Sequence, residues 1–287
     1  MHYNETHLPF RPPAPYNRLF VPPGVDTARI NAVNQDCNGY VAGAVHMTEE
    51  DFVILTALYD GELRYVDMRL QEVAQTLIRQ GRWDRTVVIV TADHGENLGE
   101  HHMMSHKFSL YDTLLRVPLI IRSPRLVPRG FVVDELAQLT DIVPTVLALA
   151  GVAADDGRLP GRALIKDGQA TPGPAFTISE RHRPNLTAFQ QRYPQFDTRK
   201  YDVRQKAIRT RREKLIWHSD EANELYDLVR DPHETDNLIE RDSERAEVLR
   251  RTLFDWFAST ERWESEAQEP AMDAVMRRQL RGLGYIE

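Results

Sequence analysis

The chain has 287 residues, of which 41% are hydrophobic and 28% charged, and this composition is typical of a globular protein. Collagen-like, low-complexity and wholly disordered classes are therefore excluded. The formal net charge is −7, from 36 basic and 43 acidic residues, so no diffuse positive field exists that would bind nucleic acid or an anionic membrane. No apolar run approaches the roughly 20 residues that span a bilayer. Polar residues near the start of the sequence interrupt the apolar run that a signal peptide requires. We expect a soluble protein and leave its compartment open.

The first half of the sequence predicts an extended segment, a long helix and a strand. Prolines crowd residues 1–25, which favours extended backbone. From Thr48 to about Gly81, apolar residues recur every three or four positions, and Thr48 and Asp51 have the spacing of a capping pair. The β-branched run over residues 86–91 predicts a strand buried on both faces. A helix followed by such a strand indicates a parallel α/β sheet.

The second half predicts shorter elements. Residues 117–121 indicate a second strand near a sheet edge, and Asp141 is the expected N-cap of a helix over residues 142–150. The Gly-, Asp- and Pro-rich stretch 151–174 is the predicted linker. After it, a small antiparallel sheet and a closing helix are predicted over the segments 207–211, 214–218, 224–228 and 244–263.

The predicted fold class is therefore α/β. A mostly parallel central sheet flanked by helices is expected within residues 1–170. A smaller C-terminal subdomain, with an antiparallel sheet plus a helix, is expected over residues 171–287.

Two polar residues, Asp93 and His94, follow directly on the predicted strand. Open α/β sheets bind ligands at this carboxyl end of a strand. Adjacent strand residues point to opposite faces, so these two side chains meet at one ion only if the chain has left the strand, which Gly95 permits. A carboxylate oxygen and an imidazole nitrogen suit a divalent cation, with further ligands from elsewhere. The alternative is that Asp93 caps a turn and His94 is a solvated loop histidine.

The loop after this pair is dense in titratable side chains. Its members are Glu96, Glu100, His101, His102, His106 and Lys107. A loop of this composition, attached to a buried strand, indicates a functional site. For His101 and His102, a hydrogen bond to the backbone is an equally good interpretation.

The run TADHGENLGEHHMMSHKFSLYDTLLRVPLIIRSP resembles the sulfatases of the alkaline-phosphatase superfamily, which carry a strand-terminal Asp-His or Asp-Asn followed by an arginine-valine-proline strand. Residues 223–237 resemble the small C-terminal sheet of that family, and residues 280–285 resemble its usual terminus. The resemblance covers nearly the whole chain. It implies a sulfuric ester hydrolase, in which residues 1–170 are the C-terminal part of the catalytic α/β domain. The implied substrate is a small-molecule or glycan sulfate ester.

The resemblance also implies roles for five residues. Asp93 and His94 correspond to two ligands of a single divalent cation. In the family this ion is usually calcium, and manganese and magnesium are the alternatives. Many relatives carry Asn in place of His94. His7 resembles the histidine that hydrogen-bonds the sulfate or the leaving oxygen, although an N-terminal histidine without a partner is the alternative. Lys107 resembles the lysine that binds a sulfate oxygen, and the adjacent His106 could share this role.

The family's nucleophile has no counterpart in this sequence. It is a formylglycine made from the cysteine of a C-x-P-S-R segment, whereas Cys37, the single cysteine, is followed by Asn38 and Gly39. We therefore expect residue 1 to be an internal position of a longer, truncated sulfatase that is inactive alone. Two alternatives stay open: a phosphonate or phosphate mono- or diester hydrolase of the same superfamily, and a non-catalytic binding remnant.

Overall fold

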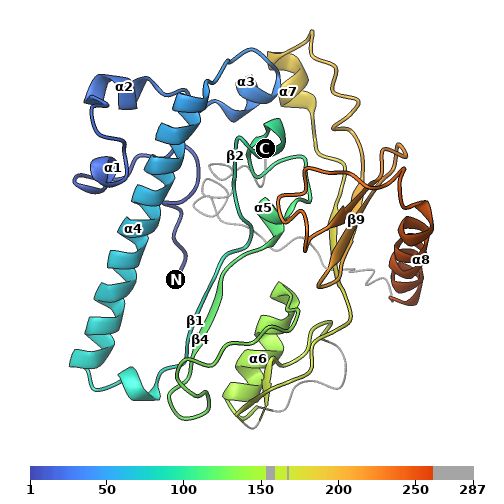
Figure 1. Cartoon of the computed structure of the whole chain (residues 1–287). Coiled ribbons are helices and arrows are strands. Elements are labelled where there is room, and N and C mark those ends of the chain that lie inside the picture. The colour runs from blue at the N-terminus through green and yellow to red at the C-terminus, as the bar shows by residue number, and fades with distance from the viewer. Residues whose placement is uncertain (153–158, 167, 261–287) are drawn as a thin grey trace. The chain divides into compact units, whose positions relative to one another are not determined.

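The computed structural model of the chain describes residues 1–152, 159–166 and 168–260. Residues Met1–Leu253 form one compact unit, and Phe254–Glu287 are assigned to a second. Helices and strands are mixed along the first unit (Figure 1), which confirms the predicted α/β class. No helix of the described residues is long and apolar enough to cross a membrane.

The N-terminal segment is fixed against a long helix. Residues 1–15 hold no helix or strand, as predicted, but three short unpredicted helices follow: α1 (Tyr16–Leu19), α2 (Thr27–Ala32) and α3 (Cys37–Val41). Phe10 is 1% exposed, and its backbone exchanges two hydrogen bonds with the Gln35 side chain, of 2.6 and 3.1 Å. This packing places the neighbouring residue His7 close to the core.

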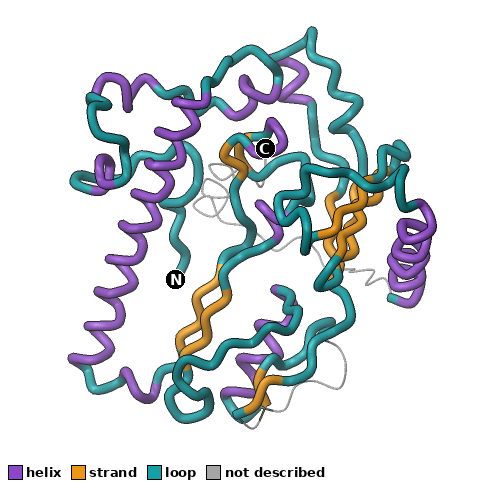
Figure 2. The backbone as a smooth tube through the Cα atoms, viewed as in Figure 1, coloured by secondary structure: helices purple, strands orange, loops and turns teal. Residues whose placement is uncertain are grey.

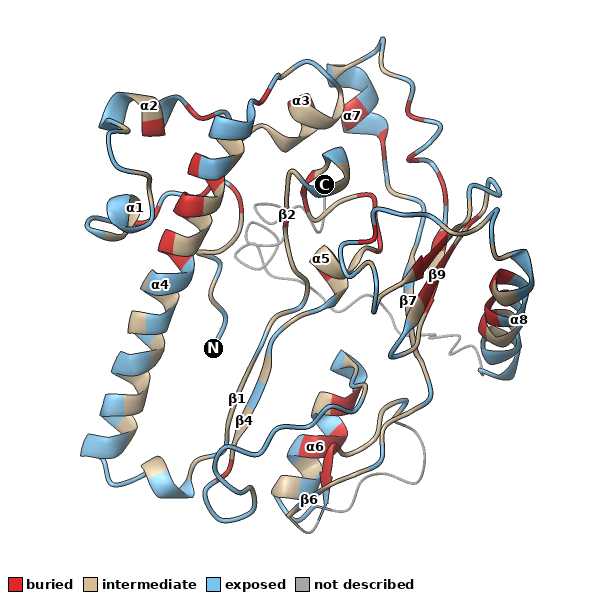
Figure 3. Ribbon diagram, viewed as in Figure 1, coloured by how far each residue is buried: buried red, intermediate tan, exposed pale blue. Residues whose placement is uncertain are grey.

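The long helix α4 (Glu49–Arg79) begins where the sequence predicts. Thr48 and Asp51 form a reciprocal capping box, in which the Asp51 amide donates to Thr48 Oγ1 at 3.2 Å and the Thr48 amide donates to Asp51 Oδ2 at 2.8 Å. The buried residues of α4 all lie between Ile54 and Glu62, and the remaining turns are half-buried or exposed (Figure 3). Only the first half of this helix therefore packs into the core.

Strands β1 (Val88–Thr91) and β4 (Leu119–Arg122) form an antiparallel pair, in which Val90 lies opposite Ile120 (Figure 2). The predicted parallel pairing is not found among the described strands. A continuous apolar run is typical of parallel strands, but it does not fix the direction of the partner strand. The prediction that β1 is buried on both faces is wrong, because its residues are half-buried or exposed.

The connection between β1 and β4 carries the polar loop. It contains β2 (Asn97–Leu98), a 3-10 turn, β3 (Met104–Ser105) and the single-turn helix α5 (Asp112–Leu115). β2 and β3 pair antiparallel. The loop is thus a small hairpin that returns the chain toward the end of β1.

Beyond β4 the chain forms α6 (Ile142–Leu149) and a hairpin of β5 (Ile165–Lys166) and β6 (Gln169–Ala170). Asp141 stands before α6 as predicted, but its carboxylate accepts the Gln138 and Arg162 amides, both at 2.9 Å, instead of capping the helix. The sequence predicts a linker over residues 151–174. This is wrong for the β5–β6 hairpin, which lies within that stretch and packs on α6. Residues 153–158 lie outside the described part.

A four-stranded antiparallel sheet follows, in the order β10-β9-β8-β7. Its strands are β7 (Thr177–Arg181), β8 (Gln205–Arg209), β9 (Glu213–His218) and β10 (Glu224–Asp227), with α7 (Thr187–Arg192) after β7. The sheet and the closing helix α8 (Ser243–Ser259) are confirmed, whereas β7 was not predicted. The predicted end of α8 beyond residue 260, and residues 280–285, lie outside the described part.

Candidate active site

The loop that follows β1 is anchored at close range to α5. The Gly95 amide donates to the Leu114 carbonyl oxygen at 2.8 Å, and a Cβ at this position would lie 2.0 Å from the Thr113 carbonyl oxygen. Asn97 is fully buried, and its side chain bonds the Ser105 carbonyl oxygen at 2.9 Å and the Thr113 hydroxyl at 2.6 Å. These contacts hold the polar residues at the end of the strand.

Asp93 and His94 turn toward each other. Asp93 Oδ2 lies 3.8 Å from His94 Nε2, and the side chains are 58% and 27% exposed. His94 Nδ1 lies 2.8 Å from the Gly95 carbonyl oxygen, which only accepts, so Nδ1 carries the hydrogen and Nε2 keeps its lone pair on the side of Asp93. A carboxylate oxygen and an imidazole nitrogen thus face each other on one side of the loop.

These two donors fit part of a divalent cation site. Among the residues that the structure describes, no group of three or more His, Cys, Asp or Glu side chains could hold a metal ion. The pair can therefore supply two ligands of such an ion and does not complete a coordination shell.

His106 lies between the two other histidines of the site. Its ring stacks on that of His94, with centroids 4.2 Å apart, and its centroid is 5.1 Å from that of His7. Burial, followed by the charges of His94, His7 and Lys107, lowers the pKa of His106 to about 3. His106 is therefore a neutral imidazole at physiological pH.

We expect the His106 imidazole to stay uncharged when the pH is lowered from 8 to about 4, because burial penalises its charged form. Side-chain NMR shifts of the labelled ring would be followed across this range, with free histidine, whose pKa is about 6.5, as the reference. The variant His106→Gln identifies the signal. A midpoint near 6.5 for this ring would contradict the burial seen here.

His7 and Lys107 complete the group that the sequence predicted. His7 Nδ1 lies 2.6 Å from the Leu8 carbonyl oxygen, and its buried Nε2 has no hydrogen-bond partner within the described part of the chain. Lys107 is half-buried, and its positive charge adds to the lowering of the His106 pKa and opposes the rise that burial causes in the Cys37 pKa. The structure thus links His7, His94 and His106 by ring contacts and places the Lys107 charge within reach of His106.

Two neighbours of this group were not predicted as site residues. Cys37 on α3 is half-buried, and burial raises the pKa of its thiol although Lys107 and Ser105 act against this. Burial also raises the pKa of Glu96 to about 8, and no residue that the structure describes bonds its buried Oε1. Nothing in the sequence around Cys37 indicates this contact, because α3 and the loop are far apart along the chain. Glu96 stood in the predicted loop but without a role.

The loop contains four non-glycine residues in the left-handed region: His101, His102, Ser105 and Phe108, with φ between 54° and 73°. Such backbone is strained and persists only where surrounding contacts hold it. His101 stacks on the Tyr111 ring, with centroids 3.6 Å apart. Its ring is therefore engaged with Tyr111 rather than with the other three histidines.

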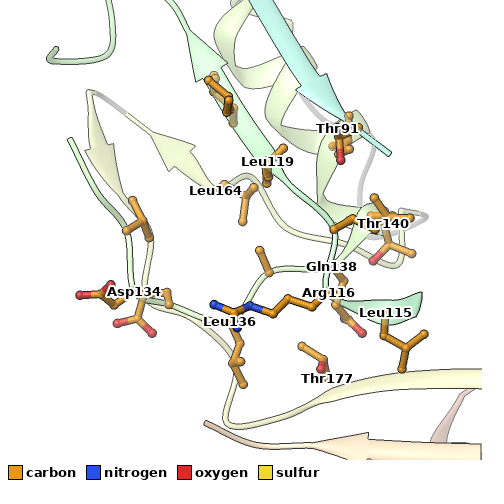
Figure 4. Close-up of a pocket in the computed structure, with 18 of the residues that line it drawn as sticks. Thr91, Leu115, Arg116, Leu119, Asp134, Leu136, Gln138, Thr140, Leu164 and Thr177 are labelled. Carbon is orange, nitrogen blue, oxygen red and sulfur yellow. The ribbon is translucent and has the colours of Figure 1, made fainter. Parts of the chain in front are cut away.

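A cavity of about 1520 Å³ lies beside the site histidines. Figure 4 shows part of its wall, with Arg116, Gln138 and Thr177 labelled. Asp93, His94 and His106 line one part of it, and Arg116, Gln138 and Thr177 line another. Its wall includes β4 and β7, so it also touches the C-terminal sheet. The volume is large enough for a drug-sized organic ligand.

The fold and this loop can be compared with known proteins. Residues 1–152 match the sulfatase family model, and residues 99–254 match the model of the C-terminal region of N-sulphoglucosamine sulphohydrolase. The chain belongs to the sulfatase family. Sulfatases are members of the alkaline phosphatase superfamily, as the resemblance implied.

Among sulfatases, arylsulfatase K of Danio rerio is 37% identical over 161 residues, which are 54% of this chain and 29% of that protein. Delta 4,5-hexuronate-2-O-sulfatase of Bacteroides thetaiotaomicron is 28% identical, over 74% of this chain and 43% of that protein. The crystal structure of phosphonate monoester hydrolase of Agrobacterium radiobacter superposes with a TM-score of 0.69 and 26% identity, over 88% of this chain and 55% of that one. The chain thus spans less than half the length of these two curated relatives.

Proposed function

We propose that this chain forms the cation- and anion-binding part of a site that hydrolyses a sulfuric ester. The observation that carries the proposal is the clustering of Asp93, His94 and His106 on the wall of one cavity, with His7 in ring contact with His106 and the charge of Lys107 nearby. In a sulfatase-family protein, such a group is suited to an ester whose oxygens are negatively charged.

Each side chain can act on a different part of a sulfate ester. Asp93 and His94 would hold a divalent cation, which supplies Lewis-acid stabilisation of developing negative charge when bound. The Lys107 ammonium group would neutralise a sulfate oxygen. His7 in its imidazolium form would donate from Nε2 to the departing oxygen, because its Nδ1 hydrogen is directed at the Leu8 carbonyl. Neutral His106 would orient the sulfate by a hydrogen bond without adding charge.

The proposed substrate is the sulfate ester of a small molecule or a glycan. Two features support it: the 1520 Å³ cavity beside the histidines, and the likeness to a hexuronate 2-O-sulfatase. A tetrahedral phosphonate presents similar oxygens to the same groups. The superposition on a phosphonate monoester hydrolase makes such an ester the second candidate.

The cation site is tested by removing one of its ligands. We expect Asp93→Ala to weaken calcium binding to the full chain at least tenfold, because the pair then loses its carboxylate and keeps only the His94 nitrogen as a ligand. Isothermal titration with calcium chloride, manganese chloride and magnesium chloride measures the affinity and the preferred ion.

The matched control is Asp84→Ala, which removes an 83% exposed carboxylate that pairs with Arg122. It should leave the affinity unchanged. Equal affinities of wild type and Asp93→Ala would refute the cation site. Titration of wild type with inorganic sulfate and with methylphosphonate then compares the two ester classes by which anion binds more tightly. Lys107→Met should weaken binding of either anion at this site.

A further inference from the structure

The segment Phe108–Asp112 directly follows His106 and Lys107 and is attached to the C-terminal part of the fold. Phe108 is 8% exposed and packs against Phe189 and Tyr201. Leu110 is 5% exposed and packs against residues of the sheet, namely Ala207, Ile216 and Tyr226. Alternate residues of this short segment therefore lie in two apolar clusters that the C-terminal region provides.

Tyr111 is bound to the sheet by a shared carboxylate. Its hydroxyl donates to Glu224 Oε2 at 2.9 Å, and the Tyr226 hydroxyl donates to the same oxygen at 2.5 Å. The other oxygen, Oε1, lies 3.0 Å from His218 Nε2. Burial and the Glu224 charge hold the pKa of both tyrosines above the usual value, so both hydroxyls remain donors.

Asp112 is bound to the sheet by ion pairs. Lys214 Nζ, on a residue with no exposed surface, lies 2.9 Å from Asp112 Oδ1 and 2.7 Å from Glu234 Oε1. Arg209 Nη2 lies 2.9 Å from Asp112 Oδ2. The Asp112 amide donates to Glu234 Oε2 at 2.6 Å. Both the backbone and the side chain of Asp112 are therefore bound to the C-terminal part of the fold.

The Lys107 ammonium group, in contrast, has no hydrogen bond or ion pair with any residue that the structure describes. Its place is set by the backbone on either side, where Ser105 and Phe108 have φ of 73° and 69°. Strained backbone relaxes when the contacts that hold it are removed. The anchoring of residues 108–112 therefore fixes the backbone that carries Lys107.

We propose that Glu224 of the C-terminal sheet is a positioning residue for Lys107 and His106, and that it acts through the Tyr111 hydroxyl. The role rests on the proposed function, since it presents these two side chains to an anionic ester. Glu224 touches neither of them. Its carboxylate fixes Tyr111, four positions after Lys107, to a sheet whose strands come from a distant part of the chain.

Two matched variants test this role in the full chain. Tyr111→Phe and Tyr226→Phe each remove one hydroxyl donor from the same Glu224 oxygen. Only Tyr111 belongs to the segment that carries Lys107. We expect Tyr111→Phe to speed amide hydrogen exchange in residues 104–110 about tenfold and to weaken binding of inorganic sulfate by a similar factor, since one charge-assisted hydrogen bond is lost. Tyr226→Phe should leave both quantities unchanged.

The conservative variant Glu224→Gln retains an acceptor and should show slower exchange in residues 104–110 than Glu224→Ala. Equal exchange in these residues for Tyr111→Phe and Tyr226→Phe would overturn the positioning role. If wild type binds no sulfate, the proposed function fails, but the exchange measurement still decides whether Glu224 holds the segment. Sulfate binding that is unaffected by Tyr111→Phe, despite faster exchange, would also overturn the role.

Discussion

Lys214→Met is expected to lower the free energy of unfolding by about 3–5 kcal/mol at pH 7, because it removes one partner of a buried ion cluster. Lys214 has no exposed surface and lies within 3 Å of carboxylate oxygens of Asp112 and Glu234, of which Glu234 is 2% exposed. Methionine fills the space but leaves Glu234 without a positive partner. Urea denaturation, followed by circular dichroism, measures the loss.

The loss of unfolding free energy caused by Lys214→Met should become smaller at acidic pH. Burial raises the pKa of Asp112, but Lys214 and Arg209 outweigh it, so the pKa lies below its usual value. A depressed carboxyl pKa stabilises the fold above the unfolded-state value and loses that contribution as the pH falls through the folded-state value. The penalty of Lys214→Met should therefore persist from pH 7 down to about pH 4 and shrink only as the pH falls below the ordinary aspartate pKa of 3.8.

The matched control is Lys206→Met, on the neighbouring strand. Lys206 Nζ lies 2.6 Å from Glu180 Oε1, and both side chains reach solvent. We expect a loss below about 1 kcal/mol for this pair. A similar loss for Lys206→Met and Lys214→Met would contradict the buried ion cluster.

Gly95→Ala is expected to destabilise the chain by about 3 kcal/mol or more, because the added methyl group has no room. Its Cβ would lie 2.0 Å from the Thr113 carbonyl oxygen and 3.2 Å from the Leu114 Cα, which are backbone atoms. The clash can be relieved only by moving the loop away from α5. We therefore also expect the contact between the His94 and His106 rings to weaken.

Thermal unfolding measures the stability change, and NMR cross-peaks between the two rings report their contact. Gly173→Ala is the comparison: its Cβ would lie 2.5 Å from Glu135 Oε2 and 2.9 Å from Glu135 Cβ, and the nearest backbone atom, the Leu136 nitrogen, is 3.1 Å away instead of 2.0 Å. Gly173→Ala should lower the stability of the fold much less than Gly95→Ala does. A Gly95→Ala variant as stable as wild type would show that the loop and α5 are not in close contact.

The sequence alone located the residues of the candidate site but not their surroundings. Asp93, His94, His106 and Lys107 stand within one predicted loop, and the run of β-branched residues before them placed this loop at a strand end. The proximity of Cys37 to Lys107 comes from packing of α3 against the loop, and no local pattern encodes it. The chemical roles of Asp93, His94, His106 and Lys107 stay predictions.

What the sequence determined are features whose causes act over a few residues. The capping box of Thr48 and Asp51 sets the start of α4, and helical periodicity sets its length. The antiparallel pairing of β1 with β4, the extra strand β7 and the lowered pKa of His106 were decided by the tertiary structure. The hydrogen bond from Tyr111 to Glu224 joins residues 113 positions apart. Pairing direction, burial and charge compensation depend on which distant segments meet in space, and only the folded chain brings them together.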